Sequence, residues 1–364
     1  MTRGLVIEAA DVAEVGGEMA TPAVSATGRW TERRGVWLRI RAEDGTVGEG
    51  EASPLPGYSV DDLDVARAAL ETMPWDRIGA LDPTRDPLAQ VRRALQLVKG
   101  GVPSARFAVE TALLDLLGRR RGVPVHRLLG EGPVEPVEPV PLCQLLDGAD
   151  DQRLRRSADG AVQSGFRAVK MKIGRDPDGD VQRVATVRSI VGPDTWLRLD
   201  ANRGLPAERL AELLQELAVL DPELLEEPAS LPVVCRLASS PVPLAVDETL
   251  HDPAMRDRVR AATRAGRYVT WVLKPMALGG MLACLDLARE ARAAGADVVV
   301  SHLFDGPVAH AAAAELALAL GPGRAVGLGW HAGLGVWPER PSPSLRSTSL
   351  VPHGRPGLGL GDPP

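Results

Sequence analysis

The first part of the chain alternates between apolar and polar residues over short stretches, as in residues 35–41, Gly-Val-Trp-Leu-Arg-Ile-Arg. Alternation with a period of two is typical of strands that bury one face. Acidic residues and a glycine at 43–45 predict a turn between two such strands. We therefore expect a small antiparallel sheet over about residues 5–51.

The pattern becomes helical between residues 59 and 129. One amphipathic segment opens at 60–63, and a second is expected over 107–117 with Ser104 as its N-cap. A meander followed by helices, before any alternation of strands and helices, indicates an α+β domain of its own. We assign residues 1–134 to this domain.

Residues 48–58 join the predicted sheet to the predicted helices. They contain too many glycines and prolines for the interior of a strand or helix, so we expect a loop there. Such a loop beside a binding site can act as a lid, and we assign four of its residues to the lid: Ser53, Pro54, Leu55 and Pro56.

Beyond residue 141, short apolar runs alternate with helical stretches. Eight runs are predicted to be strands: 141–145, 168–173, 195–199, 224–225, 244–246, 269–273, 297–300 and 325–329. Runs without polar alternation are typical of parallel strands that are covered by helices on both faces. Eight strand–helix units favour a closed α/β barrel over an open doubly wound sheet, which also lacks its glycine-rich turn here.

The boundaries of the barrel follow from composition. Residues 130–141 are rich in proline and acidic residues and are predicted to be a linker, so we assign 135–335 to the barrel. The remaining segment, 336–364, begins rich in proline and regains apolar residues near its end. We expect it to return to the N-terminal domain.

Lysine is rare in this chain: there are four, and the other 38 of its 42 basic residues are arginine. Three of the four, Lys170, Lys172 and Lys274, lie in or at the end of apolar runs. A buried ammonium group can lose its proton, whereas a guanidinium group cannot. These lysines are therefore candidates for a general base, although a single buried lysine more often packs its stem and extends its head to the surface.

Three carboxylates end neighbouring predicted strands. Asp200, Glu226 and Asp247 lie 26 and 21 residues apart, about one strand–helix unit each, which places them together at the mouth of a barrel. Each could instead cap the helix that follows its strand. Three oxygen ligands without histidine or cysteine suit a hard cation, Mg²⁺ first.

Lys172 ends the strand before Asp200, and Lys274 ends the strand after Asp247. The two lysines therefore approach the carboxylates from opposite sides, and Lys170 shares the face of Lys172. Asn202, the only asparagine, could support this site or be a simple turn residue. A base beside a cation that stabilises an enolate predicts removal of a proton next to a carboxylate.

Charge and cysteine content limit the other possibilities. The net charge of −6 and the scattered arginines argue against a nucleic-acid partner. The three cysteines are far apart, which argues against a disulfide framework or a cysteine-bound zinc ion and fits a reducing cytoplasm. No signal peptide or membrane span is predicted. We expect a cytoplasmic enzyme acting on a small carboxylate, with its oligomeric state open.

Five motifs resemble the muconate-lactonizing subgroup of the enolase superfamily. They are Val-Lys-Met-Lys at 169–172, Arg-Leu-Asp-Ala-Asn at 198–202, Leu-Glu-Glu-Pro at 225–228, Val-Asp-Glu-Thr-Leu at 246–250 and Leu-Lys-Pro at 273–275. Within the subgroup the chain resembles the o-succinylbenzoate synthases of menaquinone biosynthesis most, through residues 53–58, 103–107 and 274–280. The resemblance covers about residues 30–330, while the stretch 301–307 contains fewer serines than that family leads one to expect.

The resemblance implies a (β/α)7β TIM-like barrel with an α+β N-terminal capping domain. It implies Mg²⁺, with Mn²⁺ as a substitute, on Asp200, Glu226 and Asp247, and Lys172 as the acid/base catalyst. Lys274 would stabilise the enolate from the other side. Lys170 and Arg198 would assist. The implied substrate contacts are Arg198, Asn202, Ser301 and Gly327, the last two facing the far end of the substrate. Loops near 16–22 and 53–58 would seal the site.

The implied reaction is the dehydration of 2-succinyl-6-hydroxy-2,4-cyclohexadiene-1-carboxylate to 2-succinylbenzoate. An N-acylamino acid racemase or dipeptide epimerase, with Lys172 and Lys274 as the bases of the two faces, is the main alternative. Muconate cycloisomerisation comes third. A barrel that only binds anions would need no Mg²⁺ and would not explain the bias in lysine positions.

Overall fold

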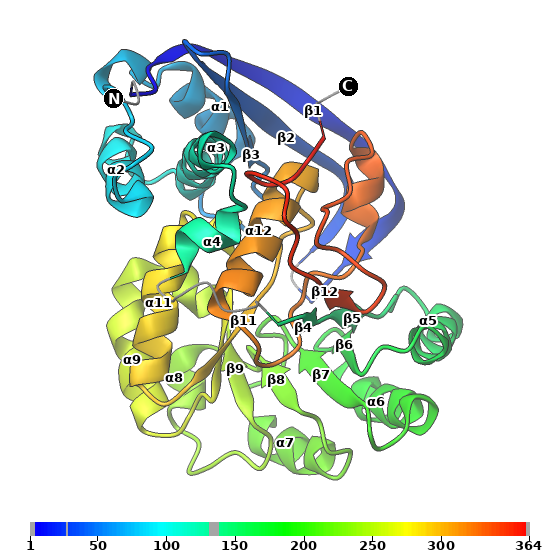
Figure 1. The fold of residues 1–364 in the computed structure, drawn as a ribbon. Coiled ribbons are helices and arrows are strands. Elements are labelled where there is room, and N and C mark those ends of the chain that lie inside the picture. The colour runs from blue at the N-terminus through cyan, green and yellow to red at the C-terminus, as the bar shows by residue number, and fades with distance from the viewer. Residues whose placement is uncertain (1–3, 27, 131–137, 362–364) are drawn as a thin grey trace.

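The computed structural model describes residues 4–26, 28–130 and 138–361. The chain folds into two parts, a capping domain and a barrel (Figure 1). The cap begins with an antiparallel sheet in the order β1 (Ile7–Val24), β2 (Arg29–Ala42) and β3 (Val47–Ala52). Its helices are α1 (Leu63–Glu71), α2 (Pro87–Ala94), α3 (Pro103–Arg121) and α4 (Val125–Leu129). The predicted antiparallel sheet and its turn are thus confirmed.

The predicted loop over 48–58 is wrong in its first half, because residues 47–52 form β3. Its glycines are there for packing. A Cβ at Gly48 would lie 2.1 Å from the carbonyl oxygen of Ala112, and one at Gly50 would lie 2.0 Å from that of Ala108. Helix α3 therefore packs directly on the backbone of β3, which only glycine allows.

Two other local predictions need correction. Ser104 does not cap the long helix, which begins at Pro103; its hydroxyl donates to Asp61 Oδ2 at 2.6 Å, so Asp61 binds the first helical turn. Residues 16–22 are not a loop, because they lie within β1. The strand carries a register shift between Glu18 and Ala23, and its hairpin turn follows Val24 instead.

The barrel is a parallel sheet of seven strands in chain order (Figure 1). They are β5 (Cys143–Leu145), β6 (Ala168–Lys172), β7 (Trp196–Asp200), β8 (Leu224–Glu226), β9 (Leu244–Val246), β10 (Thr270–Leu273) and β11 (Asp297–Val300). The eighth predicted run forms single parallel bridges, Leu142 to Val326 and Ser301 to Gly327. These bridges join the two edges of the sheet and close the barrel.

Helices follow each of the seven strands and cover the barrel from outside (Figure 1). They are α5 (Asp151–Gln163), α6 (Pro177–Val191), α7 (Leu210–Ala218), α8 (Leu231–Val234), α9 (Arg256–Arg264), α11 (Met281–Ala293) and α12 (Pro307–Leu320), with a short α10 (Pro275–Leu278) before α11. Strands β6 to β10 are apolar at most positions and nearly all buried, as parallel strands covered by helices must be. The predicted TIM-like barrel with a capping domain is confirmed.

The cap and the barrel are held together by buried polar contacts. Glu51, at the end of β3, accepts hydrogen bonds from the backbone N–H groups of Gly306 (2.6 Å), Val308 (3.1 Å) and Ala309 (3.2 Å). A carboxylate of the cap thus satisfies the free N–H groups at the start of α12, a helix of the barrel.

The last residues pass back over the cap. Strand β12 (Ser349–Leu350) pairs with β4 (Val140–Pro141), and the N–H of Leu358 donates to Asp115 Oδ1 on α3 at 2.8 Å. Most of the predicted linker, 131–137, lies outside the described residues.

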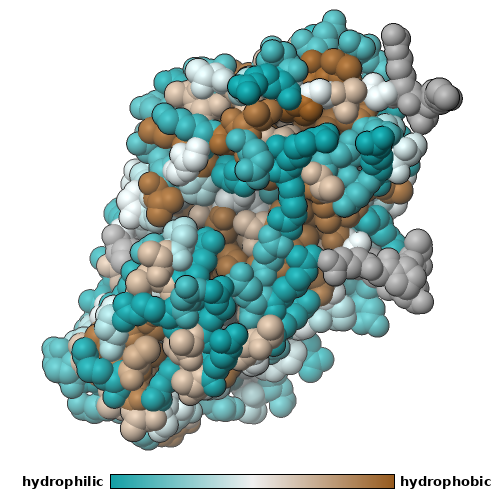
Figure 2. Space-filling view, turned by 90° about the vertical axis from the view of Figure 1, so that its left-hand side faces the viewer, coloured by the Kyte–Doolittle hydropathy of each residue, from teal (hydrophilic) through white to brown (hydrophobic). Residues whose placement is uncertain are grey.

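Figure 2 shows hydrophilic residues over most of one face, with hydrophobic ones in smaller patches between them. Among the described residues, no helix is long and apolar enough to cross a bilayer.

Candidate active site

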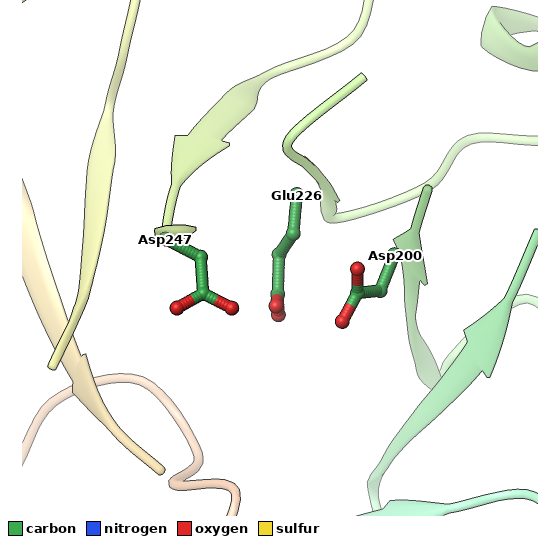
Figure 3. Close-up of side chains that lie close together, drawn as sticks. All are labelled: Asp200, Glu226 and Asp247. Atoms are coloured by element: carbon green, nitrogen blue, oxygen red, sulfur yellow. The ribbon is translucent and has the colours of Figure 1, made fainter. Parts of the chain in front are cut away.

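Three carboxylates meet where β7, β8 and β9 end. Asp200 and Glu226 are register partners at the ends of β7 and β8, and Asp247 follows β9. Because the strands are parallel neighbours, the three side chains extend side by side into the same space (Figure 3). One oxygen of each lies within 4.8 Å of the others, and all three residues are at most 2% exposed.

Lysines flank these carboxylates on both sides. From β6, Lys170 Nζ lies 3.0 Å from Glu226 Oε2 and 3.1 Å from Asp200 Oδ2. Lys172 Nζ lies 2.6 Å from the same Asp200 oxygen. From the far side, after β10, Lys274 pairs with Asp247 Oδ2. We call these three lysines and three carboxylates the floor of the site.

The charges of the floor control one another. Burial acts to lower the pKa of the Lys170 ammonium, but Glu226 and Asp200 outweigh burial and raise it. For Lys274, burial is likewise outweighed, mainly by Asp247. The expectation that burial alone lowers lysine pKa values therefore fails for these two, because the carboxylates lie in direct contact. Burial raises the pKa of Asp247, but Lys274 outweighs it and holds that pKa well below its usual range.

The carboxylate cluster suits a hard divalent cation. All its donor atoms are oxygen, and none of the three residues faces bulk water. Asp247 Oδ1 is buried and accepts no hydrogen bond among the described residues, although His251 Nε2 lies 3.7 Å from it. A buried carboxylate oxygen without a hydrogen bond is costly, and a metal ion would satisfy it. Asp200, Glu226 and Asp247 thus fit Mg²⁺.

A second layer of residues orients the floor. Asn202 Oδ1 accepts from Lys172 Nζ at 2.7 Å, and its Nδ2 donates to Glu248 Oε1 at 2.5 Å. Glu227 accepts from the N–H groups of Asp247 (2.9 Å) and Thr249 (2.8 Å). Asn202 (φ 41°) and Glu227 (φ 41°) both adopt left-handed backbone conformations, a strain typical of functional sites.

A pocket opens above the floor, and all four sequence-predicted substrate contacts line it: Arg198, Asn202, Ser301 and Gly327. A Cβ at Gly327 would lie 2.7 Å from Ser301 Oγ, so this wall needs glycine. Arg198 also lines the pocket, but its guanidinium donates to Glu223 Oε2 at 2.7 Å and to the Ala325 carbonyl at 2.5 Å. The guanidinium of Arg198 therefore donates to acceptors of the protein itself.

Only some residues of the segment after β3 line the pocket. Leu55 and Tyr58 line the pocket. Ser53 and Pro54 instead accept, through their carbonyl oxygens, from Arg33 of β2 at 2.5 and 3.1 Å. The Pro56 carbonyl accepts from Trp30 Nε1 at 2.9 Å. Three of the four lid residues thus anchor the segment rather than line the pocket.

The Tyr58 hydroxyl joins this segment to the floor. It accepts from Lys274 Nζ at 2.6 Å and donates to Asp247 Oδ2 at 3.1 Å. The Lys274 ammonium also lies 4.7 Å from the centre of the Tyr58 ring, within the range of a cation–π contact. The sequence placed Tyr58 in the same stretch but not among the site residues.

Sequence reasoning missed the aromatic wall. Trp30, Phe304 and Trp330 line the pocket together with Tyr58, in a chain with only three phenylalanines, two tyrosines and seven tryptophans. Their scarcity was the only signal available. We call Trp30, Leu55, Tyr58 and Phe304, with the buried Arg33 behind them, the roof; Arg33 Nε also donates to the Phe304 carbonyl at 3.0 Å.

Two family models match the chain. The N-terminal domain of the mandelate racemase and muconate lactonizing enzymes matches residues 7–130, and the enolase C-terminal domain-like model matches residues 153–361. Together these matches cover both the cap and the barrel.

Named relatives have several activities. The chain is 32% identical over 277 residues to the L-Ala-D/L-Glu epimerase of Escherichia coli, covering 76% of this chain and 79% of the epimerase. It is 26% identical over 304 residues to the N-succinyl-L-Arg/Lys racemase of Bacillus cereus, covering 82% and 80%. The structure of the Pseudomonas fluorescens muconate lactonizing enzyme with muconolactone superposes with a TM-score of 0.84, at 25% identity over 98% of this chain and 97% of that enzyme.

Proposed function

Because the chain belongs to the mandelate racemase and muconate lactonizing enzyme family of the enolase superfamily, we propose that it removes the proton next to a substrate carboxylate. The preferred reaction is the dehydration of 2-succinyl-6-hydroxy-2,4-cyclohexadiene-1-carboxylate to 2-succinylbenzoate. The observation that carries the proposal is the floor: lysines on both sides of three buried carboxylates, all at one end of the barrel.

Asp200, Glu226 and Asp247 would hold Mg²⁺, with Mn²⁺ as a substitute. When bound, the cation would supply positive charge that makes the α-proton of a carboxylate more acidic. Their full burial supports this role, since a dry site strengthens every charge interaction.

Lys172 is the proposed base. Its side chain is the most exposed of the three floor lysines, 23% against 13% for Lys170 and 6% for Lys274. Asp200 and Asn202 fix the direction of its amine. As a neutral amine it would take the α-proton, and it would return that proton to the hydroxyl group that leaves the ring as water. The C–H and C–O bonds break and the ring becomes aromatic.

Lys274 is proposed to stabilise the negative charge that develops on the substrate. Tyr58 and Asp247 hold its ammonium in place from two directions, as suits a fixed cation. Lys170, paired with Glu226 and Asp200, would keep the carboxylates oriented.

Racemisation of N-acylamino acids is the second candidate. Lys172 and Lys274 both line the pocket, as two bases on opposite faces require. The racemase of Bacillus cereus, which acts on N-succinylated substrates according to its name, supports this alternative. Among the described residues, Glu226 is the only acid that lines the pocket, so a free ammonium of an unacylated dipeptide finds no partner beyond the floor.

The test is an assay of the purified protein with Mg²⁺. We expect formation of 2-succinylbenzoate from the cyclohexadiene carboxylate, followed by its aromatic absorbance. N-succinyl-L-phenylalanine in D₂O, followed by NMR and optical rotation, measures the second candidate. Racemisation without dehydration would transfer the assignment to the racemase, and no exchange of α-protons with either substrate would contradict both.

A further inference from the structure

Three histidines cluster at one wall of the pocket, and His302 is the one of them that lines it. The ring centres of His302 and His331 lie 4.0 Å apart with the planes 27° from parallel, and His310 lies 5.7 Å from His331. His302 follows β11 and lines the pocket; His310 belongs to α12, and His331 follows the last barrel segment. Half of the six histidines of the chain therefore belong to this cluster.

A backbone hydrogen bond determines which ring nitrogen of the neutral His302 carries the proton. Its Nδ1 accepts from the N–H of Phe304 at 2.9 Å, so the neutral ring carries its proton on Nε2. Burial lowers the pKa of His302 well below its ordinary value and that of His310 to about 4. His302 is thus a neutral hydrogen-bond donor at neutral pH.

The backbone around His302 is held under strain. Phe304 adopts a left-handed conformation with φ of 55°, which a bulky side chain rarely does. Its N–H is held by His302 and its carbonyl by the buried Arg33. Strain that the surroundings maintain is typical of binding and active sites.

Within the cluster, His331 alone lacks hydrogen-bond partners among the described residues. Both ring nitrogens of His331 are buried, the residue being 3% exposed, and neither has a hydrogen-bond partner among the described residues. Buried polar groups in native proteins are nearly always paired, so an unpaired ring indicates that a ligand or water completes it. Ser301, next in the chain to His302, adds a hydroxyl group to the same wall.

From these contacts we infer that His302, stacked on His331 and next to Ser301, binds a carbonyl or carboxylate oxygen at the far end of the substrate. This inference rests on the proposed removal of an α-proton and specifies the substrate class. The substrate is a carboxylic acid whose tail carries an oxygen acceptor, as succinyl groups do, and not an ammonium group.

Calorimetry with two stable probes in the presence of Mg²⁺ tests the inference. 2-Succinylbenzoate has the tail, and benzoate is the matched compound without it. We expect the wild-type protein to prefer 2-succinylbenzoate, and His302→Leu to bind it about 10-fold more weakly, the cost of one lost hydrogen bond in a buried site. Benzoate binding should not change. His302→Gln, which can donate from a similar position, should recover most of the lost affinity.

Equal affinity of the wild-type protein for both probes would overturn the inference, as would unchanged tail binding in His302→Leu. An equal loss for both probes, with melting temperatures showing a folded variant, would also overturn it, because the effect would then not belong to the tail. N-succinyl-L-phenylalanine serves as a second tailed probe. If neither substrate loses its α-proton while the tail preference depends on His302, the proposed reaction fails and the subsite stands.

Discussion

The floor and the roof of the pocket are built in opposite ways. The floor takes its six charged residues from strands that follow one another, between Lys170 and Lys274, and all except Lys170 lie at or directly after a strand end. The roof joins residues that are far apart in the chain: Arg33 binds a carbonyl 271 residues away. The floor is charged and repeats with the fold, whereas the roof is aromatic and depends on contacts between cap and barrel. The proposed chemistry thus rests on residues that the fold repeats, whereas the aromatic part of the pocket rests on contacts that occur once.

Removal of the metal should have the largest effect, because it changes the charge of the whole floor. We expect EDTA to abolish activity and Mg²⁺ to restore it. Asp247→Asn should weaken Mg²⁺ binding measured by calorimetry. A ligand at 100 times its Kd stabilises a protein by about 2.7 kcal/mol, so Mg²⁺ should also raise the Tm. Full activity in metal-free buffer would contradict the assignment of the carboxylates.

Within the floor, the two outer lysines should separate by role. Lys172→Arg cannot accept a proton near neutral pH, and we expect kcat to fall about 10³-fold, as for loss of a general base. Lys274→Arg keeps the cation and should retain more activity. Exchange of the α-proton with D₂O, read by NMR, should depend on Lys172. The exposed Lys99→Arg is the matched control and should leave kcat unchanged.

Equal losses in Lys172→Arg and Lys274→Arg would favour two bases and hence the racemase. Substantial activity in Lys172→Arg would refute the base itself.

Substitution of Arg33 in the roof should lower the stability of the protein more than it changes catalysis. Arg33 is 1% exposed and donates to three carbonyl oxygens. Arg33→Met leaves these acceptors unpaired and should lower the free energy of unfolding by about 3 kcal/mol, measured with urea. Its neighbour Arg34, 55% exposed and paired with Glu14, gives the control. Arg34→Met should change the free energy of unfolding by less than about 0.5 kcal/mol. Similar losses in both variants would show that the hydrogen bonds of Arg33 do not stabilise the roof.

The smallest effect is expected where roof and floor touch. Tyr58→Phe removes the hydroxyl that accepts from Lys274 but keeps the ring, and kcat should fall about 10-fold, the worth of one charged hydrogen bond. Tyr268→Phe removes a buried hydroxyl that has no partner among the described residues and should leave kcat unchanged. If the two variants behave alike, Tyr58 does not position Lys274.

The sequence was sufficient to place the floor, because parallel strands end on one side of a barrel and each acidic or lysine residue follows an apolar run. It could not give the direction in which the pKa values of Lys170 and Lys274 are shifted, which depends on distances such as that between Lys170 and Glu226. It mistook most of β3 for a loop, because Gly48 and Gly50 are required by the packing of α3, a helix that follows much later in the chain. The three clustered histidines gave no periodic signal, since only His310 lies in a helix and the other two lie outside helices and strands.

Glu51 has a consequence for how such proteins can be recombined. The carboxylate that satisfies the first N–H groups of α12 comes from the cap, not from the barrel itself. A chimera that joins this barrel to the cap of a relative inherits a helix start without its acceptor unless the transplanted strand carries an acid at the same place. Cap and barrel must therefore be exchanged or evolved as a matched pair, with the register of β3 as the condition for compatibility.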